Sequence, residues 1–339
     1  MKKLYVYVLL IWVSISVFGQ ENKKSNAILK YKKTGAIQVL DPMLNTLVDT
    51  AFGIEILAEG FDWSEGPLWI AKGNYLLFSD IPPNKIMKWS EEKGIEEYLH
   101  PSGYTGTVPR GGEPGSNGLI LDNKGRLVLC QHGDRRMARM EAPLNKPEAK
   151  FITLTDNYEG KKLNSPNDAV YHSNGDLYFT DPPYGLVNNM KDVTKEIPYQ
   201  GVYRLKKSGE LELLTKEMSR PNGIAFSPDE KKLYVANSDL NRIWMVYDVQ
   251  ADGGISNGKI FYDANAAQDK DPGWPDGMKI DKKGNIFATG PGGVVVFDSN
   301  AKMLGKIKVG QTCSNVAFDA KYQYLYITAD GWLVRVKLH

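Results

Sequence analysis

The chain has 339 residues, of which 42% are hydrophobic and 24% are charged, and this balance is typical of a globular protein with a large core and not of a disordered one. Its 42 basic and 40 acidic residues leave a net charge of +2. The basic residues are scattered through turns such as Lys231-Lys232 and Lys282-Lys283 and form no single stripe. The composition therefore argues against a nucleic-acid partner.

The N-terminus has the parts of a secretory signal peptide over residues 1–19. A pair of lysines precedes an apolar run from Leu4 to Phe18, and Gly19 is small enough for cleavage before Gln20. The alternative is a retained membrane anchor, but the run is shorter than the ~20 apolar residues that span a bilayer. We therefore expect an exported protein, periplasmic or secreted, with no membrane contact once the signal is removed.

Residues 20–53 form an N-terminal extension that precedes the repeats described next. Within it, the stretch from Leu40 to Val48 predicts a short helix.

A repeat recurs six times in the rest of the chain. In each unit a small residue or Pro precedes one Glu, Asn or Asp, and a short apolar strand follows. In five of the six units a turn with Gly or Pro-Asp then leads to a second strand, which is the pattern of a hairpin. We call the six polar residues the polar ring: Glu65, Asn117, Asn167, Asn222, Asp276 and Asn315.

The spacing of the polar ring, at 52, 50, 55, 54 and 39 residues, leaves room for four strands per unit. This predicts a six-bladed β-propeller of four-stranded antiparallel blades, one domain over residues 54–339. A β-sandwich also has many short strands, but it would not place the same polar residue at the head of the same strand six times. The last unit lacks an outer strand, and Ile54–Ala58 is expected to supply it and close the ring.

The two cysteines, Cys130 and Cys313, fall in non-adjacent units, so we expect buried free thiols instead of a disulfide. For the whole protein we expect a monomer or a weak dimer.

The first strand of every propeller blade lines the central channel, so the polar ring should converge there. It offers two carboxylates and four amides, an all-oxygen set that suits Ca²⁺ first and Mg²⁺ or Mn²⁺ next, with Zn²⁺ as a further alternative. The competing interpretation is that Asn-Gly and Asp-Gly pairs are only turn residues. Glu65 argues against it, because Glu is a poor turn former and a carboxylate in a channel needs a cation or donors.

A second tier follows the polar ring by 14 or 15 residues, at the ends of the second strands. For Asp80, Asp181 and Asp330 we favour structural hydrogen bonds. For His132 a role as general base or substrate contact stays open beside a structural one. The second tier consists of Asp80, His132, Asp181, Asn237, Gly290 and Asp330.

Several motifs together resemble the gluconolactonase family, which is related to regucalcin (senescence marker protein) and luciferin-regenerating enzyme, and more distantly to a phosphotriesterase that hydrolyses diisopropyl fluorophosphate. The resemblance covers about residues 40–338. It rests on Trp63-Ser64-Glu65-Gly66-Pro67, Ser116-Asn117-Gly118-Leu119, His132-Gly133-Asp134-Arg135-Arg136, Ser165-Pro166-Asn167-Asp168, Tyr178-Phe179-Thr180-Asp181-Pro182-Pro183-Tyr184-Gly185, Arg220-Pro221-Asn222-Gly223 and Pro275-Asp276-Gly277.

The resemblance implies one Ca²⁺ or similar divalent ion held by the residues that match Glu65, Asn222 and Asp276, with Asn167 as a further ligand or substrate contact. Regucalcin-like members have an Arg where this chain has Ser165, so substrate orientation must come from other residues. The candidates for substrate binding are Asn117, Asn167, Arg110, Arg135 (or its neighbour Arg136) and Tyr184. Trp274 is a further candidate for stacking on a sugar ring.

The function that this implies is hydrolysis of a sugar lactone such as gluconolactone to the aldonic acid. The metal would polarise the ester carbonyl, and Asp276 would take a proton from the attacking water, with His132 as a second candidate catalytic residue. Residues 102–115 would be either a lid over the channel or a plain surface loop. Two rival functions remain open at this point: another ester or phosphotriester hydrolase, and a non-catalytic binding module stabilised by its metal.

Overall fold

The computed structural model describes residue 1, residues 31–267 and residues 270–339. The predicted signal peptide over residues 1–19 lies outside the described residues. Within the part that is described, no helix is long and apolar enough to cross a membrane. Residues 31–339 form one compact unit.

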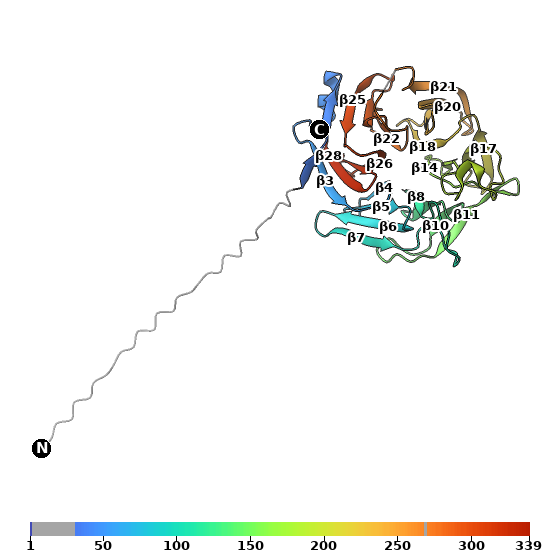
Figure 1. The fold of residues 1–339 in the computed structure, drawn as a ribbon, viewed down its shortest axis with the longest axis horizontal. Helices are drawn as coiled ribbons and strands as arrows, with labels where there is room; N and C mark the ends of the chain where they lie inside the picture. The colour runs from blue at the N-terminus through green and yellow to red at the C-terminus, as the bar shows by residue number, and fades with distance from the viewer. Residues whose placement is uncertain (2–30, 268–269) are drawn as a thin grey trace. The chain divides into compact units, whose positions relative to one another are not determined.

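The described chain folds into six antiparallel sheets arranged in a ring, which confirms the predicted six-bladed β-propeller (Figure 1). We number the blades in the order of their innermost strands. Blade 1 consists of β4 (Ser64–Ile70), β5 (Tyr75–Asp80), β6 (Lys85–Ser90) and β7 (Gly94–Leu99). Blade 2 consists of β8 (Ser116–Leu121), β9 (Leu127–Gln131), β10 (Arg136–Met140) and β11 (Phe151–Thr155). Blade 3 consists of β14 (Ala169–Tyr171), β15 (Leu177–Asp181), β16 (Gly201–Leu205) and β17 (Leu211–Thr215).

The remaining three blades follow the same order from the channel outward, and two of them gain a fifth strand. Blade 4 consists of β18 (Pro221–Phe226), β19 (Lys232–Asn237), β20 (Ile243–Val249) and β21 (Ile255–Asp263). Blade 5 consists of β22 (Met278–Ile280), β23 (Ile286–Gly290), β24 (Gly293–Phe297), β25 (Met303–Lys308) and β2 (Ala36–Val39). Blade 6 consists of β26 (Cys313–Phe318), β27 (Tyr324–Ala329), β28 (Trp332–Lys337), β3 (Ile54–Glu59) and β1 (Lys32–Thr34).

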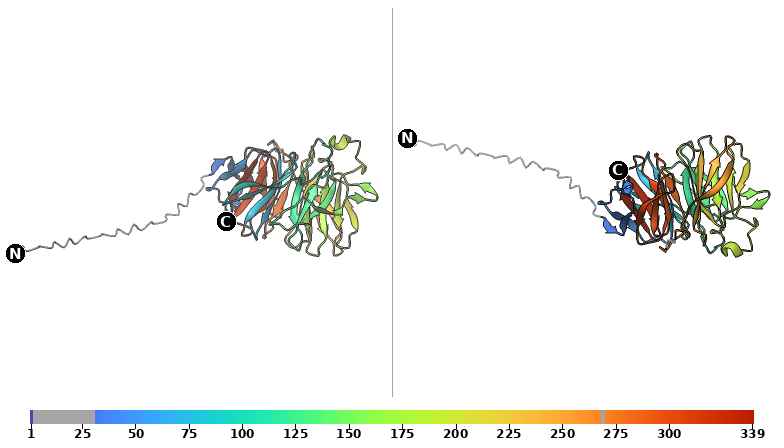
Figure 2. Two further views of the ribbon diagram at one scale, coloured as in Figure 1. Left: turned by 90° about the horizontal axis from the view of Figure 1, so that it is seen from below. Right: turned by 90° about the horizontal axis from the view of Figure 1, so that it is seen from above.

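The ring closes as predicted, because β3 pairs antiparallel with β28, with Ile56 opposite Val334. In Figure 2 the blue N-terminal strands lie beside the red C-terminal strands of this blade. The segment ahead of β3 continues the closure, since β1 extends blade 6 and β2 extends blade 5. A short 3₁₀ helix, η1 (Pro42–Thr46), lies within the stretch where a helix was predicted.

Two small elements lie outside the blades, one between blades 2 and 3 in the chain and one between β15 and β16 of blade 3. They are a two-stranded hairpin of β12 (Asn157–Tyr158) and β13 (Lys161–Lys162), and a second 3₁₀ helix, η2 (Asn189–Lys191).

The hydrophobic core is divided into six clusters, one between each pair of neighbouring blades. Between blades 6 and 1, for example, Phe78 and Trp89 pack with Tyr326, and between blades 4 and 5 Trp244 packs with Phe297. Both cysteines are free and buried, as expected. Because every blade is packed on two faces, the position of each inner strand is set by both of its neighbours.

Hydroxyl groups on the second strands of blades 1, 3 and 5 fasten these blades to blades 2, 4 and 6 at the level of the polar ring. Ser79 Oγ donates to the carbonyl of Asn117 at 2.8 Å, and Thr180 Oγ1 donates to the carbonyl of Asn222 at 2.8 Å. Thr289 Oγ1 donates to the carbonyl of Ser314, next to Asn315, at 2.9 Å. These buried bonds fix the backbone of the polar ring, because a buried carbonyl left without a donor costs free energy.

Second-tier carboxylates hold the loops that enter the inner strands. Asp80 Oδ1 accepts from the amides of Asp62 and Trp63, at 3.0 and 3.1 Å. Asp181 accepts from the amides of Asn164 and Ser165, at 2.8 and 2.7 Å. The structural role predicted for Asp80 and Asp181 is thus confirmed.

Asp330 also holds the entry to an inner strand, but it does so through its carbonyl, which accepts from the amide of Ser64 at 2.9 Å. A fourth member of the tier, Asn237, accepts from the amide of Arg220 through Oδ1 at 2.9 Å.

We expect Thr180→Val to destabilise the protein by about 1–2 kcal/mol, because the buried carbonyl of Asn222 loses its hydroxyl donor while the side-chain volume is kept. Thermal unfolding should show a melting temperature lower by about 2–5 °C. Thr155→Val is the matched control, since the hydroxyl of Thr155 is part-exposed and makes only a 3.5 Å contact with a carbonyl. Equal losses in both variants would contradict the fastening role.

The pH dependence of stability should carry a contribution from Asp181, whose pKa is raised to about 7 by burial. Since the pKa of an unfolded Asp is about 4, the folded chain binds more protons than the unfolded chain between about pH 4 and pH 7. This contribution is therefore fully present below pH 4 and falls as the pH rises towards 7. The melting temperature of Asp181→Asn should change less between pH 5 and pH 8 than that of the wild type, and an unchanged slope would refute the assignment.

Candidate functional site

The polar ring meets at one end of the inner strands. Glu65, Asn117 and Asn222 are each the second residue of β4, β8 and β18. Asn167 and Asp276 lie two residues ahead of β14 and β22, where their amides donate to the carbonyls of Thr180 and Thr289 at 2.9 and 3.1 Å. All five side chains are therefore held by main chain that is tied to the second strand of their own blade.

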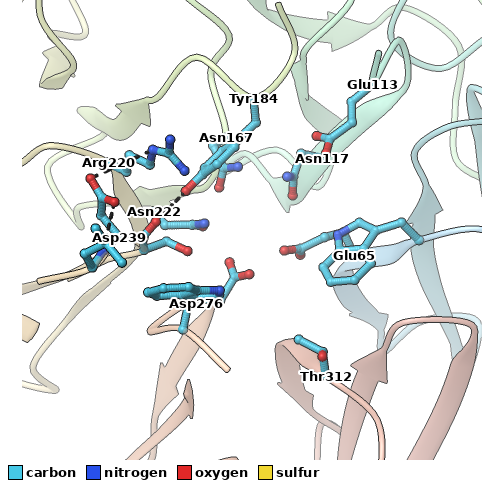
Figure 3. Close-up of a pocket in the computed structure, with 14 residues that line it drawn as sticks. Glu65, Glu113, Asn117, Asn167, Tyr184, Arg220, Asn222, Asp239, Asp276 and Thr312 are labelled. Carbon is cyan, nitrogen blue, oxygen red and sulfur yellow. Dashed lines mark hydrogen bonds and ion pairs between the residues drawn. The ribbon is translucent and has the colours of Figure 1, made fainter. Parts of the chain in front are cut away.

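These five residues line one cavity of about 470 Å³, a size that suits a small molecule. Figure 3 shows the carboxylates of Glu65 and Asp276 and the amides of the three asparagines pointing into the same space from different blades. The cavity is lined by Trp63, Glu65, Glu113, Asn117, Asn167, Tyr184, Arg220, Asn222, Ser238, Asp239, Leu240, Trp274, Asp276 and Thr312.

The sixth member of the ring, Asn315, does not line the cavity and serves Glu65 instead. Its Nδ2 donates to Glu65 Oε2 at 3.2 Å, and its own Oδ1 accepts from the amide of Val316. Glu65 Oε2 also accepts from the amide of Gly66 at 2.6 Å. The orientation of the Glu65 carboxylate is thus fixed by two donors that both bond to Oε2.

The two carboxylates of the ring are costly to ionise together. Glu65 is 1% exposed, and burial raises its pKa to about 7, with a further contribution from the charge of Asp168. The pKa of Asp276 is raised well above its usual value by burial and by the nearby carboxylates of Glu65, Asp168 and Glu113. Such a pair requires either bound protons or a cation between its members.

Several oxygens at the floor of the cavity have no hydrogen-bond partner among the described residues. They are Asn117 Oδ1, Asn167 Oδ1 and Asp276 Oδ1. Asp168 Oδ2 is likewise buried without a partner but belongs to a residue that does not line the cavity. Among the described residues, no group of three His, Cys, Asp or Glu side chains is arranged to hold a metal ion. Amides make up most of the polar ring instead. Unpartnered carboxylate and amide oxygens around two buried acids fit a hard divalent cation, and an oxygen-only set fits Zn²⁺ less well.

His132 does not line the cavity. The ring is fully buried, and Nδ1 lies 3.2 Å from Oε2 of Glu113, which does line it. The histidine predicted as a candidate catalytic residue therefore lies outside the cavity lining and contacts Glu113, whose side chain lines it.

The loop of residues 102–115 is fastened to the blades and supplies Glu113 to the cavity wall. Asn84 Oδ1 accepts from three consecutive amides at its start, and Asp134 accepts from both the amide and the hydroxyl of Thr105. The amide of Gly115 donates to the carbonyl of Ile81 at 3.0 Å. Both ends of the loop are thus tied to neighbouring turns.

Arg110 and Arg135, which the sequence offers as candidates for orienting the substrate, lie outside the cavity lining. Both guanidinium groups bond to main-chain carbonyls elsewhere. Arg110 donates to Gly133 and Gly185, and Arg135 donates to the carbonyls of Leu163, Asn164 and Thr194.

The neighbouring candidate Arg136 bonds Gln131 and Thr153 and also lies outside the cavity lining. Ser165, which stands where regucalcin-like members have an Arg, is fully buried, and its hydroxyl donates to the carbonyl of Pro182 at 2.5 Å.

The aromatic candidates do reach the cavity. Tyr184 lines it and donates its hydroxyl to the carbonyl of Ser238 at 2.9 Å, and burial raises its pKa. Trp274 lines it as well and is 43% exposed, so its ring is available at the rim.

Sequence reasoning missed the charged and aromatic wall residues Trp63, Glu113, Arg220 and Asp239, as well as Ser238 and Thr312. Three of the charged and aromatic residues lie next to recognised positions, since Trp63 and Arg220 each come two residues ahead of a ring member and Asp239 follows the second tier by two. That proximity was the available signal. Glu113 carried no such signal, because it lies within a long loop.

Gluconolactonases and a regucalcin are among the proteins similar to this chain. A gluconolactonase of Zymomonas mobilis is 41% identical over 316 residues, which cover 89% of this chain and 86% of that protein. The solved structure of a gluconolactonase from Xanthomonas campestris superposes with a TM-score of 0.78 at 29% identity, over 91% of this chain and 98% of the other. Regucalcin of Danio rerio is 24% identical and covers 81% of this chain and 85% of its own.

The family model described as the SMP-30/Gluconolactonase/LRE-like region matches residues 63–331, a span that begins at Trp63, two residues ahead of the first ring member, and ends directly ahead of β28 of the closing blade. With a propeller of six blades, a polar cavity at its channel and this match over most of its length, the chain belongs to the SMP-30/gluconolactonase/LRE-like family.

Proposed function

We propose that this protein is a divalent-metal-dependent hydrolase that opens a sugar lactone, such as gluconolactone, to the aldonic acid, with Ca²⁺ as the first candidate ion. The observation that carries the proposal is the pair of carboxylates of Glu65 and Asp276 facing a small-molecule cavity among unpartnered amide oxygens. The gluconolactonases similar to this chain support the choice of a lactone among the ester substrates.

Glu65, Asn167, Asn222 and Asp276 would hold the ion, since all four line the cavity and offer oxygens. Asn117, with its own unpartnered Oδ1, is a further candidate. When bound, a divalent cation supplies Lewis-acid polarisation of an ester carbonyl and offsets the negative charge that develops on its oxygen. Glu65 is the residue best fixed for such binding, because Gly66 and Asn315 hold its carboxylate in place.

Asp276 is the proposed proton acceptor. Its Oδ1 is unpartnered, so it is free to accept a hydrogen bond from a water in the cavity. In the reaction the water oxygen attacks the lactone carbonyl carbon and one water proton passes to Asp276. The ring C–O bond then breaks, and Asp276 returns this proton to the ring oxygen, which becomes a hydroxyl of the product. The new carboxylic acid releases the second water proton to solvent. The asparagines of the site cannot take the first water proton at neutral pH, because amides are not basic.

Loss of a ligand carboxylate should remove metal binding and activity together while the fold is kept. We expect Glu65→Gln to weaken Ca²⁺ binding measured by calorimetry at least tenfold and to lower the release of acid from glucono-δ-lactone in a pH-stat in parallel. Glu97→Gln is the matched control, because Glu97 is an exposed carboxylate of β7 whose partner is Lys85. Full Ca²⁺ affinity in Glu65→Gln would show that the assignment of the site is wrong.

Replacement of Asp276 should separate proton transfer from binding. Asp276→Asn keeps an oxygen that faces the cavity but removes the proton acceptor, so we expect kcat to fall by about 10²–10⁴. The measurement is the rate at saturating Ca²⁺ and saturating lactone, so that weaker binding of either does not contribute. A kcat within threefold of the wild type would exclude Asp276 as the base.

A further inference from the structure

One wall of the cavity carries a single cation. Arg220 is the only Lys or Arg that lines the cavity among the residues described, and its side chain is 35% exposed. Figure 3 shows it beside Asp239 and Tyr184, on the wall formed by blades 3 and 4. Its place in the wall is not used by the proposed chemistry at Glu65 and Asp276.

The main chain behind this wall is held firmly. The amide of Arg220 donates to Oδ1 of Asn237 at 2.9 Å, and the hydroxyl of Tyr184 donates to the carbonyl of Ser238 at 2.9 Å. The guanidinium carbon lies 5.7 Å from the centre of the Tyr184 ring, within the range of a cation–π contact. The position of the guanidinium is therefore set before any ligand arrives.

Within the described residues, the guanidinium of Arg220 contacts the side chains of Tyr184 and Asp239, which leaves most of its five N–H donors unused. Its Nε lies 3.9 Å from Oδ2 of Asp239, which is an ion pair but too long for a hydrogen bond. A guanidinium has five N–H donors in a flat fork, and the Asp239 carboxylate beside it only accepts. Donor and acceptor thus lie next to each other on one wall.

Hydroxyl groups match such a pair, because each hydroxyl both donates and accepts. An anionic substituent matches it poorly. Apart from Arg220, the charged side chains that line the cavity within the described chain are the carboxylates of Glu65, Glu113, Asp239 and Asp276. A phosphate or carboxylate on the substrate would be repelled by these groups, and the one cation already has a carboxylate partner.

We propose that Arg220 and Asp239 form a subsite that binds neighbouring hydroxyl groups of an uncharged polyhydroxylated lactone and so selects it over plain and phosphorylated lactones. This rests on the proposed function, since the lactone carbonyl is placed at Glu65 and Asp276. Arg220 donates to the hydroxyl oxygens through its fork, and Asp239 accepts from a hydroxyl proton. The exposed ring of Trp274 at the rim gives a ring-shaped ligand an apolar face to contact.

The test compares substrates that differ only in the groups that this subsite reads. Arg220→Met is assayed with glucono-δ-lactone and with δ-valerolactone, which has the same ring without hydroxyls. We expect KM for glucono-δ-lactone to rise at least tenfold with kcat changed less than threefold, and kcat/KM for δ-valerolactone to change less than twofold. Equal losses for both lactones, or no loss for either, would overturn the proposal.

Arg126→Met is the matched control, because Arg126 also pairs with an aspartate and has a similar exposed fraction of 37%, but it does not line the cavity. Arg220→Lys tests the fork, since Lys keeps the charge but presents a single point of donation. The increase in log KM for glucono-δ-lactone should be at least half as large in Arg220→Lys as in Arg220→Met. A wild-type KM in Arg220→Lys would overturn the assigned geometry. This variant also serves if Arg220→Met melts at a lower temperature than the wild type.

Asp239→Asn tests the exclusion of anions. Removal of this carboxylate should raise the relative kcat/KM for the 6-phosphate of glucono-δ-lactone against the unphosphorylated lactone at least fivefold, and an unchanged ratio would overturn this part. A wild-type protein that hydrolyses neither glucono-δ-lactone nor δ-valerolactone in the presence of Ca²⁺ would instead refute the proposed function itself. The two failures are therefore distinguishable.

Discussion

The facing carboxylates of Glu65 and Asp276 are the constraint to which the rest of the site responds. They come from blades 1 and 5, they point into one cavity, and burial raises the pKa of both. Two neighbouring buried carboxylates must either bind a proton or have their negative charges offset by a cation. The fold keeps this arrangement because its stability comes from six separate hydrophobic clusters between blades, so the unfavourable charge at the channel is a small part of a large structure.

The inner strands carry the polar ring, but the second strands position it. Ser79, Thr180 and Thr289 lie at equivalent places in blades 1, 3 and 5, and each donates to a carbonyl at or next to a ring member of the following blade. A displacement of one blade would therefore move a ligand of its neighbour. Closure by β3 completes the circle, and the buried ion pair of Glu55 with Arg335 joins β3 to β28 at 2.8 Å. A rigid ring of this kind is suited to holding several oxygens at set distances around one point.

The sequence was sufficient for the fold and for the floor of the site, because both are repeated. Six polar heads ahead of six apolar strands, with hairpin turns after them, indicate blades, and equivalent positions in blades converge on the channel axis. The walls are not repeated and could not be predicted in this way. Arg110 and Arg135 looked available, but each bonds to carbonyls far away in the sequence, at Gly185 and Thr194. Only tertiary contacts decide which arginine of such a chain faces the cavity.

The division between a repeated floor and unique walls also separates two kinds of chemistry. The floor holds oxygens that face the cavity without partners, and their arrangement follows from the propeller itself. The walls come from the loops and strand ends of single blades, as with Glu113 in the loop of residues 102–115 and Asp239 after β19. A change in the floor acts directly on the buried carboxylates, whereas a change in a wall acts mainly on what fits against it, although the wall residue Glu113 also raises the pKa of Asp276. Relatives on this scaffold can therefore keep one reaction and differ in substrate, with the differences located in residues that no blade repeat specifies.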